Sequence, residues 1–243
     1  MAYKTKLTGG NGNFHQMMTS GFGIVTVMNA KIFDVEALTK GDTETDKFFK
    51  KSAEAIYNAL ITKVESKDES YLCEIDTFKV ANVTMEGPTK TITGGQYTNP
   101  LIKFGKTARL EMQDALGRSE AIEALCGGVQ EWEVSSEGTG ATETIVGLHF
   151  GADFSGAKMI VGDSFFIDRV SGQQVPVKII FYQFLPDSLF NLTQDAEGDA
   201  TVFDMNGDLL MTNILVAKSK TDNTFDQTST HGVFYSIVAV PEE

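Results

Sequence analysis

The chain has 243 residues, of which 42% are hydrophobic and 22% are charged, a composition that excludes intrinsic disorder. Twenty Lys and Arg stand against thirty-three Asp and Glu, so the net charge is −13, with most of the acidic excess after residue 186. A surface of this sign repels phosphate backbones and disfavours ordinary nucleic-acid binding. No apolar run approaches the roughly 18 residues of a membrane span, and the first ten residues lack an apolar signal core.

Short stretches rich in β-branched and aromatic residues run through the whole chain, separated by turn residues. This pattern is typical of strands. We predict strands over residues 23–35, 71–83, 103–112, 130–134, 144–150, 158–167, 175–184, 201–205, 208–215 and 232–240. Polar and apolar residues alternate most clearly over 107–113 and around Trp132, so we expect these strands to bury one face each, as antiparallel sheets allow.

A long amphipathic helix is predicted over residues 46–64, packed on a sheet. Thr43 or Thr45 can cap its start. The apolar residues that recur at helical spacing and form its buried face are Phe49, Ala53, Ile56, Tyr57, Leu60 and Val64.

A shorter helix is predicted over residues 119–126, with Ser119 at its start and two glycines, Gly127 and Gly128, at its end. Asn206 and Gly207 predict a type I′ turn, which would make a β-hairpin of residues 201–211.

The chain reads as a single β-rich domain over residues 1–243, with a flexible N-terminal arm at about residues 1–20. Residues 135–142 and 218–230 are polar stretches of small residues and are expected to be loops. A split into two domains near Glu137 is the alternative.

Two segments resemble ligand-binding motifs. Gly105-Lys106-Thr107 matches the end of a phosphate-binding loop, but Pro100 stands where the motif needs its first glycine, and the following residues alternate like a strand. Oxygen ligands for a hard cation such as Ca²⁺ are offered by Asp195, Glu197, Asp199, Asp204, Asn206 and Asp208. They do not fit an EF-hand loop, so acidic turns without a cation are the preferred interpretation.

No residues form a catalytic constellation. His15, His149 and His231 stand far apart, and neither Cys73 nor Cys126 has a neighbouring histidine or the spacing of a metal or redox motif. We therefore predict two buried free thiols, no cofactor, no metal and no enzymatic activity.

A β-rich, acidic chain without a site is typical of a self-assembling structural protein. Residues 99–116, 175–184 and 195–208 resemble, in the order of their elements and in turn chemistry, a major tail tube protein of a long-tailed bacteriophage. The resemblance implies a β-sandwich or half-barrel with one flanking helix, that of residues 46–64. Six copies would close a ring, and the rings would stack through arms or loops such as residues 1–20, 35–45 and 86–100.

The resemblance also implies a role for the charge. Duplex DNA carries one negative charge about every 1.7 Å of its axis, so an acidic lumen would keep the duplex centred and mobile during ejection. Glu111, Glu131 and Glu133 lie at alternating strand positions and are the candidates to face this lumen. The alternative for each is a solvent-facing position that aids solubility.

By the same resemblance, the partners would be sister copies and the tape-measure, terminator and baseplate proteins. DNA would pass without specific binding, no membrane would be involved, and the location would be the virion tail after assembly in the host cytoplasm. Two other classes stay open. One comprises other β proteins of virions or injection machines: a capsid decoration protein, a baseplate ring or a secretion-system tube. The other is a calcium- or carbohydrate-binding β-sandwich module.

Overall fold

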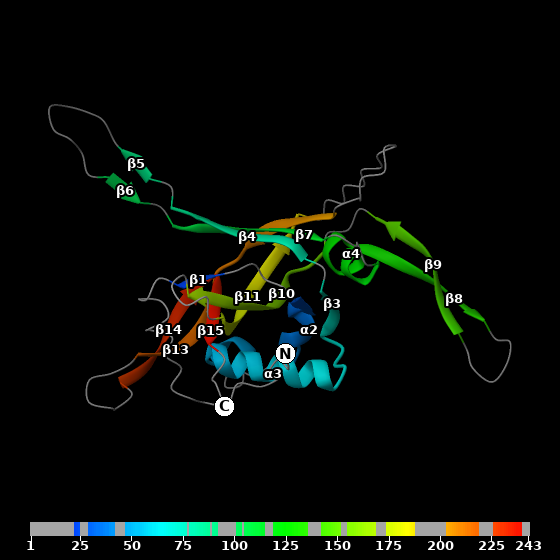
Figure 1. The fold of residues 1–243 in the computed structure, drawn as a ribbon, viewed down its shortest axis with the longest axis horizontal. Coiled ribbons are helices and arrows are strands. Elements are labelled where there is room, and N and C mark those ends of the chain that lie inside the picture. Colours follow the sequence, from blue (N-terminus) through cyan, green and yellow to red (C-terminus); the bar gives the residue numbers. More distant parts are fainter. Residues whose placement is uncertain are drawn as a thin grey trace.

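Most of the strands pair into one large antiparallel sheet (Figure 1). The computed structural model describes residues 22–24, 29–41, 47–76, 78–87, 89–91, 101–103, 105–114, 119–135, 142–151, 155–168, 174–187, 203–218 and 226–239. Within these ranges the chain is mainly β, which confirms the predicted fold class. The predicted arm at residues 1–20 lies outside them.

The large sheet has nine strands. β1 (Phe22–Ile24) pairs with β10, and β15 (Tyr235–Ala239) pairs with β11. The remaining strands follow one path, in the order β3 (Tyr71–Ile75), β2 (Asn29–Asp34), β10 (Lys158–Asp168), β11 (Gln174–Pro186), β12 (Phe203–Leu209), β7 (Thr107–Asp114) and β4 (Phe78–Glu86).

The central strands β10 and β11 are buried on both faces. Ile160 and Phe181 belong to one apolar cluster, which they share with Leu110 of β7, while Tyr182 belongs to a second cluster with Leu60 of α3 (Ala53–Glu65). One face of the central strands is therefore covered by β7 and β12, and the other by α3. This layering agrees with a β-sandwich-like fold.

Helix α3 confirms the long amphipathic helix but not its start. A 3₁₀ turn, η1 (Phe48–Lys50), precedes it, and the hydroxyl of Ser52 accepts a hydrogen bond from the Ala55 amide, so Ser52 is the N-cap. The predicted start at residue 46 with a threonine cap is wrong, because Phe49, the first residue of the predicted apolar face, belongs to the separate turn η1 and packs on the same core cluster from there. Apolar spacing alone does not distinguish one continuous helix from a 3₁₀ turn that is followed by a separate helix.

The predicted helix over residues 119–126 is confirmed as α4 (Ser119–Cys126). It ends at Gly127, whose φ of +72° lies in the left-handed region that favours glycine. The predicted loop at 35–45 is wrong in its first part, because residues 35–39 form helix α2 (Val35–Thr39). Its N-cap, Asp34, accepts hydrogen bonds from the amides of Glu36 and Ala37, at 2.8 and 3.1 Å.

The predicted turn at Asn206 and Gly207 is wrong. Both residues lie inside the continuous strand β12, where Gly207 is opposite Leu110 of β7 and Pro186 of β11. A Cβ on Gly207 would lie 2.2 Å from the carbonyl oxygen of Leu185. The glycine therefore permits a close approach of two strands and supplies no positive φ.

The other strands form three two-stranded sheets. The pairs are β5 (Thr89–Thr91) with β6 (Leu101–Lys103), β8 (Gly128–Ser135) with β9 (Thr142–Phe150), and β13 (Thr212–Lys218) with β14 (Asp226–Val233). The predicted loop over residues 218–230 is wrong from Asp226 onward, because β14 begins there. Figure 1 shows β5–β6 and β8–β9 leaving the body in opposite directions.

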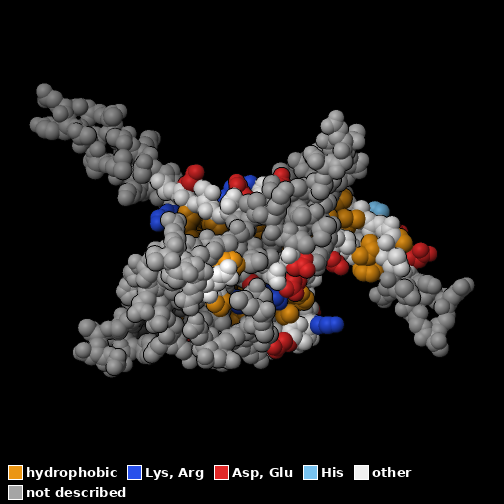
Figure 2. All heavy atoms as spheres, viewed as in Figure 1, with side chains coloured by type: hydrophobic (Ala, Val, Ile, Leu, Met, Phe, Trp, Pro, Cys, Tyr) orange, Lys and Arg blue, Asp and Glu red, His pale blue; other side chains and the backbone are white. Residues whose placement is uncertain are grey.

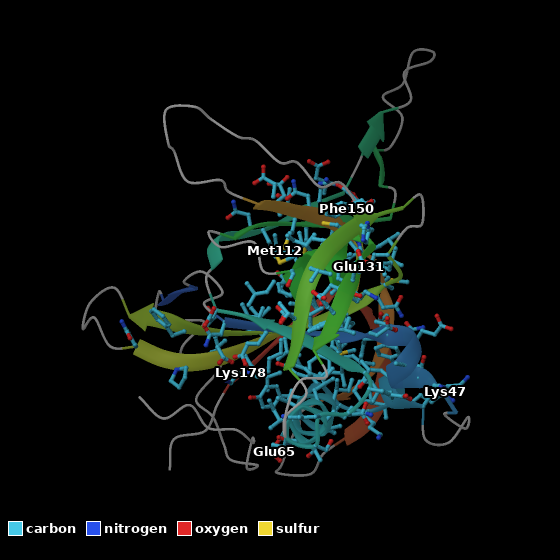
Figure 3. The ribbon with its side chains drawn as sticks, turned by 90° about the vertical axis from the view of Figure 1, so that its right-hand side faces the viewer. Lys47, Glu65, Met112, Glu131, Phe150 and Lys178 are labelled. Atoms are coloured by element: carbon cyan, nitrogen blue, oxygen red, sulfur yellow. The ribbon has the colours of Figure 1, made fainter. Side chains whose placement is uncertain are left out.

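A buried ion pair joins the two central strands. Asp163 of β10 is directly opposite Lys178 of β11, and the Lys178 ammonium donates a hydrogen bond to the Asp163 carboxylate. The same ammonium lies 5.7 Å from the ring centroid of Tyr57 on α3. Burial, and then the negative charge of Asp163, raise the pKa of the Tyr57 phenol. The pair is thus enclosed between sheet and helix (Figure 3).

Candidate assembly surface

The outward side of strands β4, β7 and β12 is polar along its described length. In β7, Ala108, Leu110 and Met112 are buried, whereas Thr107 and Glu111 are exposed. The predicted alternation is therefore confirmed. The register extends this side across three strands, and we name as the acidic strand face the residues Asn82, Thr84, Arg109, Glu111, Asp204, Asn206 and Asp208. Figure 2 shows charged side chains along the top of the body, over β4 and β7.

Arg109 is the positive charge at the middle of this face. Its Nη1 atom lies 3.3 Å from Oδ1 of Asp208, its Nε atom lies 3.9 Å from Oε1 of Glu111, and its Nη2 atom donates a hydrogen bond to Asp187. The hydrogen bond to Asp187 is the main reason why the pKa of Arg109 is raised. Three carboxylates therefore surround one guanidinium, and the acidic strand face keeps a negative excess.

Glu131 and Glu133 lie on the β8–β9 hairpin. The register places them on the same side as His149, and Oε2 of Glu131 lies 2.9 Å from Nε2 of His149. All three side chains are exposed. This side of the hairpin therefore carries the polar residues that the alternation around Trp132 predicts, together with the exposed Val129 opposite His149.

The opposite side of the hairpin carries aromatic surface. Trp132 is directly opposite Ile145, and Phe150 and Leu148 follow on the same side of β9. Trp132 and Phe150 are 49% and 47% exposed. We name Trp132, Ile145, Leu148 and Phe150 the apolar hairpin face. The expectation that this strand buries one face is not met by the single chain, because the hairpin extends beyond the body (Figure 1) and Trp132 is half-exposed. Figure 3 looks onto the hairpin and labels Glu131 and Phe150, which belong to it.

The three predicted lumen residues thus occupy two separate sheets. Glu111 belongs to the nine-stranded sheet, whereas Glu131 and Glu133 belong to the two-stranded sheet of β8 and β9. All three are exposed, but the single chain does not join them into one surface. The apolar hairpin face is the feature that the sequence analysis missed, although the Glu-Trp-Glu alternation was its signal.

The other candidate sites gain no support. Asp195, Glu197 and Asp199 lie outside the described residues, and within them no group of three or more His, Cys, Asp or Glu could hold a metal ion. The glycine and lysine at 105–106 lead into strand β7 and not into a helix, as expected. Neither Cys73 nor Cys126 forms a disulfide bond; Cys73 is buried as predicted, whereas Cys126 is only half-buried. Burial raises the pKa of the Cys126 thiol, which weakens it as a nucleophile.

Within the described part of the chain, no helix combines the length and the apolar character that crossing a bilayer requires. Models of known protein families and curated protein sequences give no match to this chain.

Proposed function

We propose that this chain is the structural subunit of a phage tail tube, forming stacked rings whose acidic wall conducts DNA. The observation that carries the proposal is the acidic strand face. It is an outward, polar side of an antiparallel sheet that is fixed from behind by the core residues Leu110, Met112 and Met205. Such a side is suited to line a lumen and does not enclose a ligand.

The charge arrangement fits passage better than binding. A wall that conducts DNA must not offer free cations to the phosphates, because each neutralised phosphate adds affinity. Arg109 is held by Asp187 and Asp208 at this face, so its guanidinium is engaged by carboxylates of its own chain. Glu111 and Asp208, whose side chains are 52% and 64% exposed, present their negative charge to solvent.

The sheet edges fit self-association. β4 is the last strand on the path of the large sheet, and among the described strands it pairs only with β7. An open edge is a site for pairing with another chain. The apolar hairpin face adds the aromatic rings of Trp132 and Phe150, each of which stays about half exposed in the single chain. Both features favour a subunit whose open sheet edge and apolar hairpin face are covered by neighbouring copies.

Negative-stain electron microscopy of the purified full chain over a range of concentrations tests the proposal. We expect closed rings and, at high concentration, hollow rods. Rings that never stack would favour a decoration or baseplate protein in its place. A strictly monomeric particle at the highest concentration would contradict every form of the proposal.

The orientation of the acidic strand face provides a second test. A gold cluster attached through a maleimide to a Glu111→Cys variant before assembly should appear inside the tube in averaged images. Thr62→Cys, on an exposed position of α3, is the matched control and should place the cluster away from the lumen. A cluster outside the tube in the Glu111→Cys variant would contradict the proposed lumen.

A further inference from the structure

The methionines that the structure describes differ sharply in exposure. Met112, Met159 and Met205 are buried in the apolar clusters, whereas Met85 on β4 is 43% exposed and Met211 is 63% exposed. Within the described ranges, no large hydrophobic side chain is more exposed than that of Met211. A thioether in water can be oxidised to the sulfoxide, so this exposure has a chemical consequence.

Met211 belongs to a short connection whose backbone is held in place. It lies between Leu209, the last residue of β12, and Thr212, the first residue of β13. The amide of Leu210 donates a hydrogen bond of 2.8 Å to the carbonyl of Gln183 on β11. The side chain of Met211 therefore starts from a backbone that the large sheet fixes.

The thioether of Met211 lies over a glycine of the neighbouring strand. A Cβ on Gly232 of β14 would be only 2.6 Å from Sδ and 3.1 Å from Cγ of Met211. Gly232 is directly opposite Asn213, so the Met211 side chain reaches diagonally across the β13–β14 pair. The glycine thus leaves the space that the thioether fills, and we name this contact the Gly232 seat.

Small oxidants can reach this side chain. Met211 lines a hollow of about 480 Å³ beside η1, together with Phe48, Phe49 and Thr212. A water molecule occupies about 30 Å³ in the liquid, so the hollow admits a small hydroperoxide. A methionine such as Met159, which is 0% exposed, offers no such access.

We infer that Met211 is a modification site: a hydroperoxide oxidises its thioether to the sulfoxide, and the sulfoxide leaves the Gly232 seat. The sulfur attacks the terminal peroxide oxygen, so that an S–O bond forms while the O–O bond breaks. The sulfur loses two electrons, and the proton of the attacked hydroxyl passes to the leaving oxygen. The peroxide is thereby reduced to an alcohol, or to water where it is hydrogen peroxide. The inference goes beyond the proposed function and does not depend on it.

Oxidation changes the environment that the end of the side chain prefers. A thioether is apolar, whereas a sulfoxide is polar. Packing a polar group against a strand without a hydrogen-bond partner costs free energy that exposure to water avoids. The sulfoxide should therefore turn to solvent and leave the pair of Asn213 and Gly232 without its cover. Methionine sulfoxide reductases reverse the oxidation, so the change is reversible.

Peptide mass spectrometry of the full chain during treatment with hydrogen peroxide tests the site. We expect Met211 to gain one oxygen atom about 10-fold faster than Met112, Met159 and Met205, which are the internal controls. Met85, at intermediate exposure, should react at an intermediate rate. Oxidation of Met211 no faster than that of the buried methionines would overturn the inference.

Hydrogen exchange tests the consequence. After oxidation, the backbone amides of residues 212–214 and 231–233 should exchange about 3-fold faster, and methionine sulfoxide reductases should restore the original rates. Met211→Leu keeps an apolar side chain without sulfur, so peroxide should leave exchange in this variant unchanged. Gly232→Ala expels the thioether from its seat, so Met211 should still be oxidised, but with no further rise in exchange.

Two results would overturn the proposed consequence. Complete oxidation of Met211 with unchanged exchange would show that the sulfoxide stays in the Gly232 seat. A rise in exchange of the same size in the Met211→Leu variant would assign the effect to another methionine.

Discussion

Gly207 provides a sensitive test of how strands β11 and β12 meet. In a Gly207→Ala variant the new Cβ would lie 2.2 Å from the carbonyl oxygen of Leu185 and 2.6 Å from the ring of Phe184. Ordinary carbon contacts need about 3.5 Å or more, so the backbone of β11 must move by about 1 Å. Three residue pairs form the ladder between these strands, and the amides of Leu210 and Asp187 donate flanking hydrogen bonds to the carbonyls of Gln183 and Asn206. So short a ladder cannot absorb such a shift without losing hydrogen bonds. We expect a loss of about 3 kcal/mol in the free energy of unfolding.

Urea denaturation followed by fluorescence measures this loss. Gly156→Ala is the matched control, because its Cβ would meet no atom within 4 Å, and we expect it to change stability by less than about 0.5 kcal/mol. Gly207→Asn separates strand from turn, since asparagine suits a type I′ turn but clashes in β12. If Gly207→Ala matched the control, or Gly207→Asn were as stable as the native chain, the close approach of the two strands would be refuted.

Three further changes test other parts of the fold, all by urea denaturation. Lys178→Met leaves the Asp163 carboxylate buried without its partner and should lower the free energy of unfolding by about 3–5 kcal/mol. The double variant with Asp163→Leu should recover most of this loss, and equal losses in the single and double variants would argue against a buried pair. Hydrogen bonds from Ser70 lower the pKa of Asp68 to about 2, so this carboxylate stabilises the fold above about pH 4 and loses its effect as the pH falls towards 2. Asp68→Asn should therefore lower stability at pH 6 but match the native chain near pH 2, and an equal deficit at both would refute the shift. Ser52→Ala should cost about 1 kcal/mol through loss of the α3 cap, and no loss would place the helix start elsewhere.

Features set by local pattern could be predicted from the sequence. Alternation identified the exposed and buried sides of β7, and the glycine after Cys126 identified the end of α4. Helical spacing found α3 but placed its start too early, because Phe49 satisfies the same spacing from the η1 turn.

Features set by distant parts of the chain could not be predicted. An Asn-Gly pair favours a turn locally, but Gly207 serves the contact with Phe184, which is remote from it in the sequence. For the candidate site, alternation correctly gave Glu111, Glu131 and Glu133 as exposed. It could not show that Trp132 is exposed too, since alternation defines two sides of a strand and not what covers either side.

The β8–β9 hairpin has a consequence for the strength of any contact that it makes. A ribbon of only two strands is marginally stable in isolation, and among the described elements α4 is the one that contacts both of its strands most. In the proposed assembly, a neighbour that covers the ribbon would therefore also order it. That ordering costs free energy, so each such contact would be weaker than its buried apolar area alone suggests.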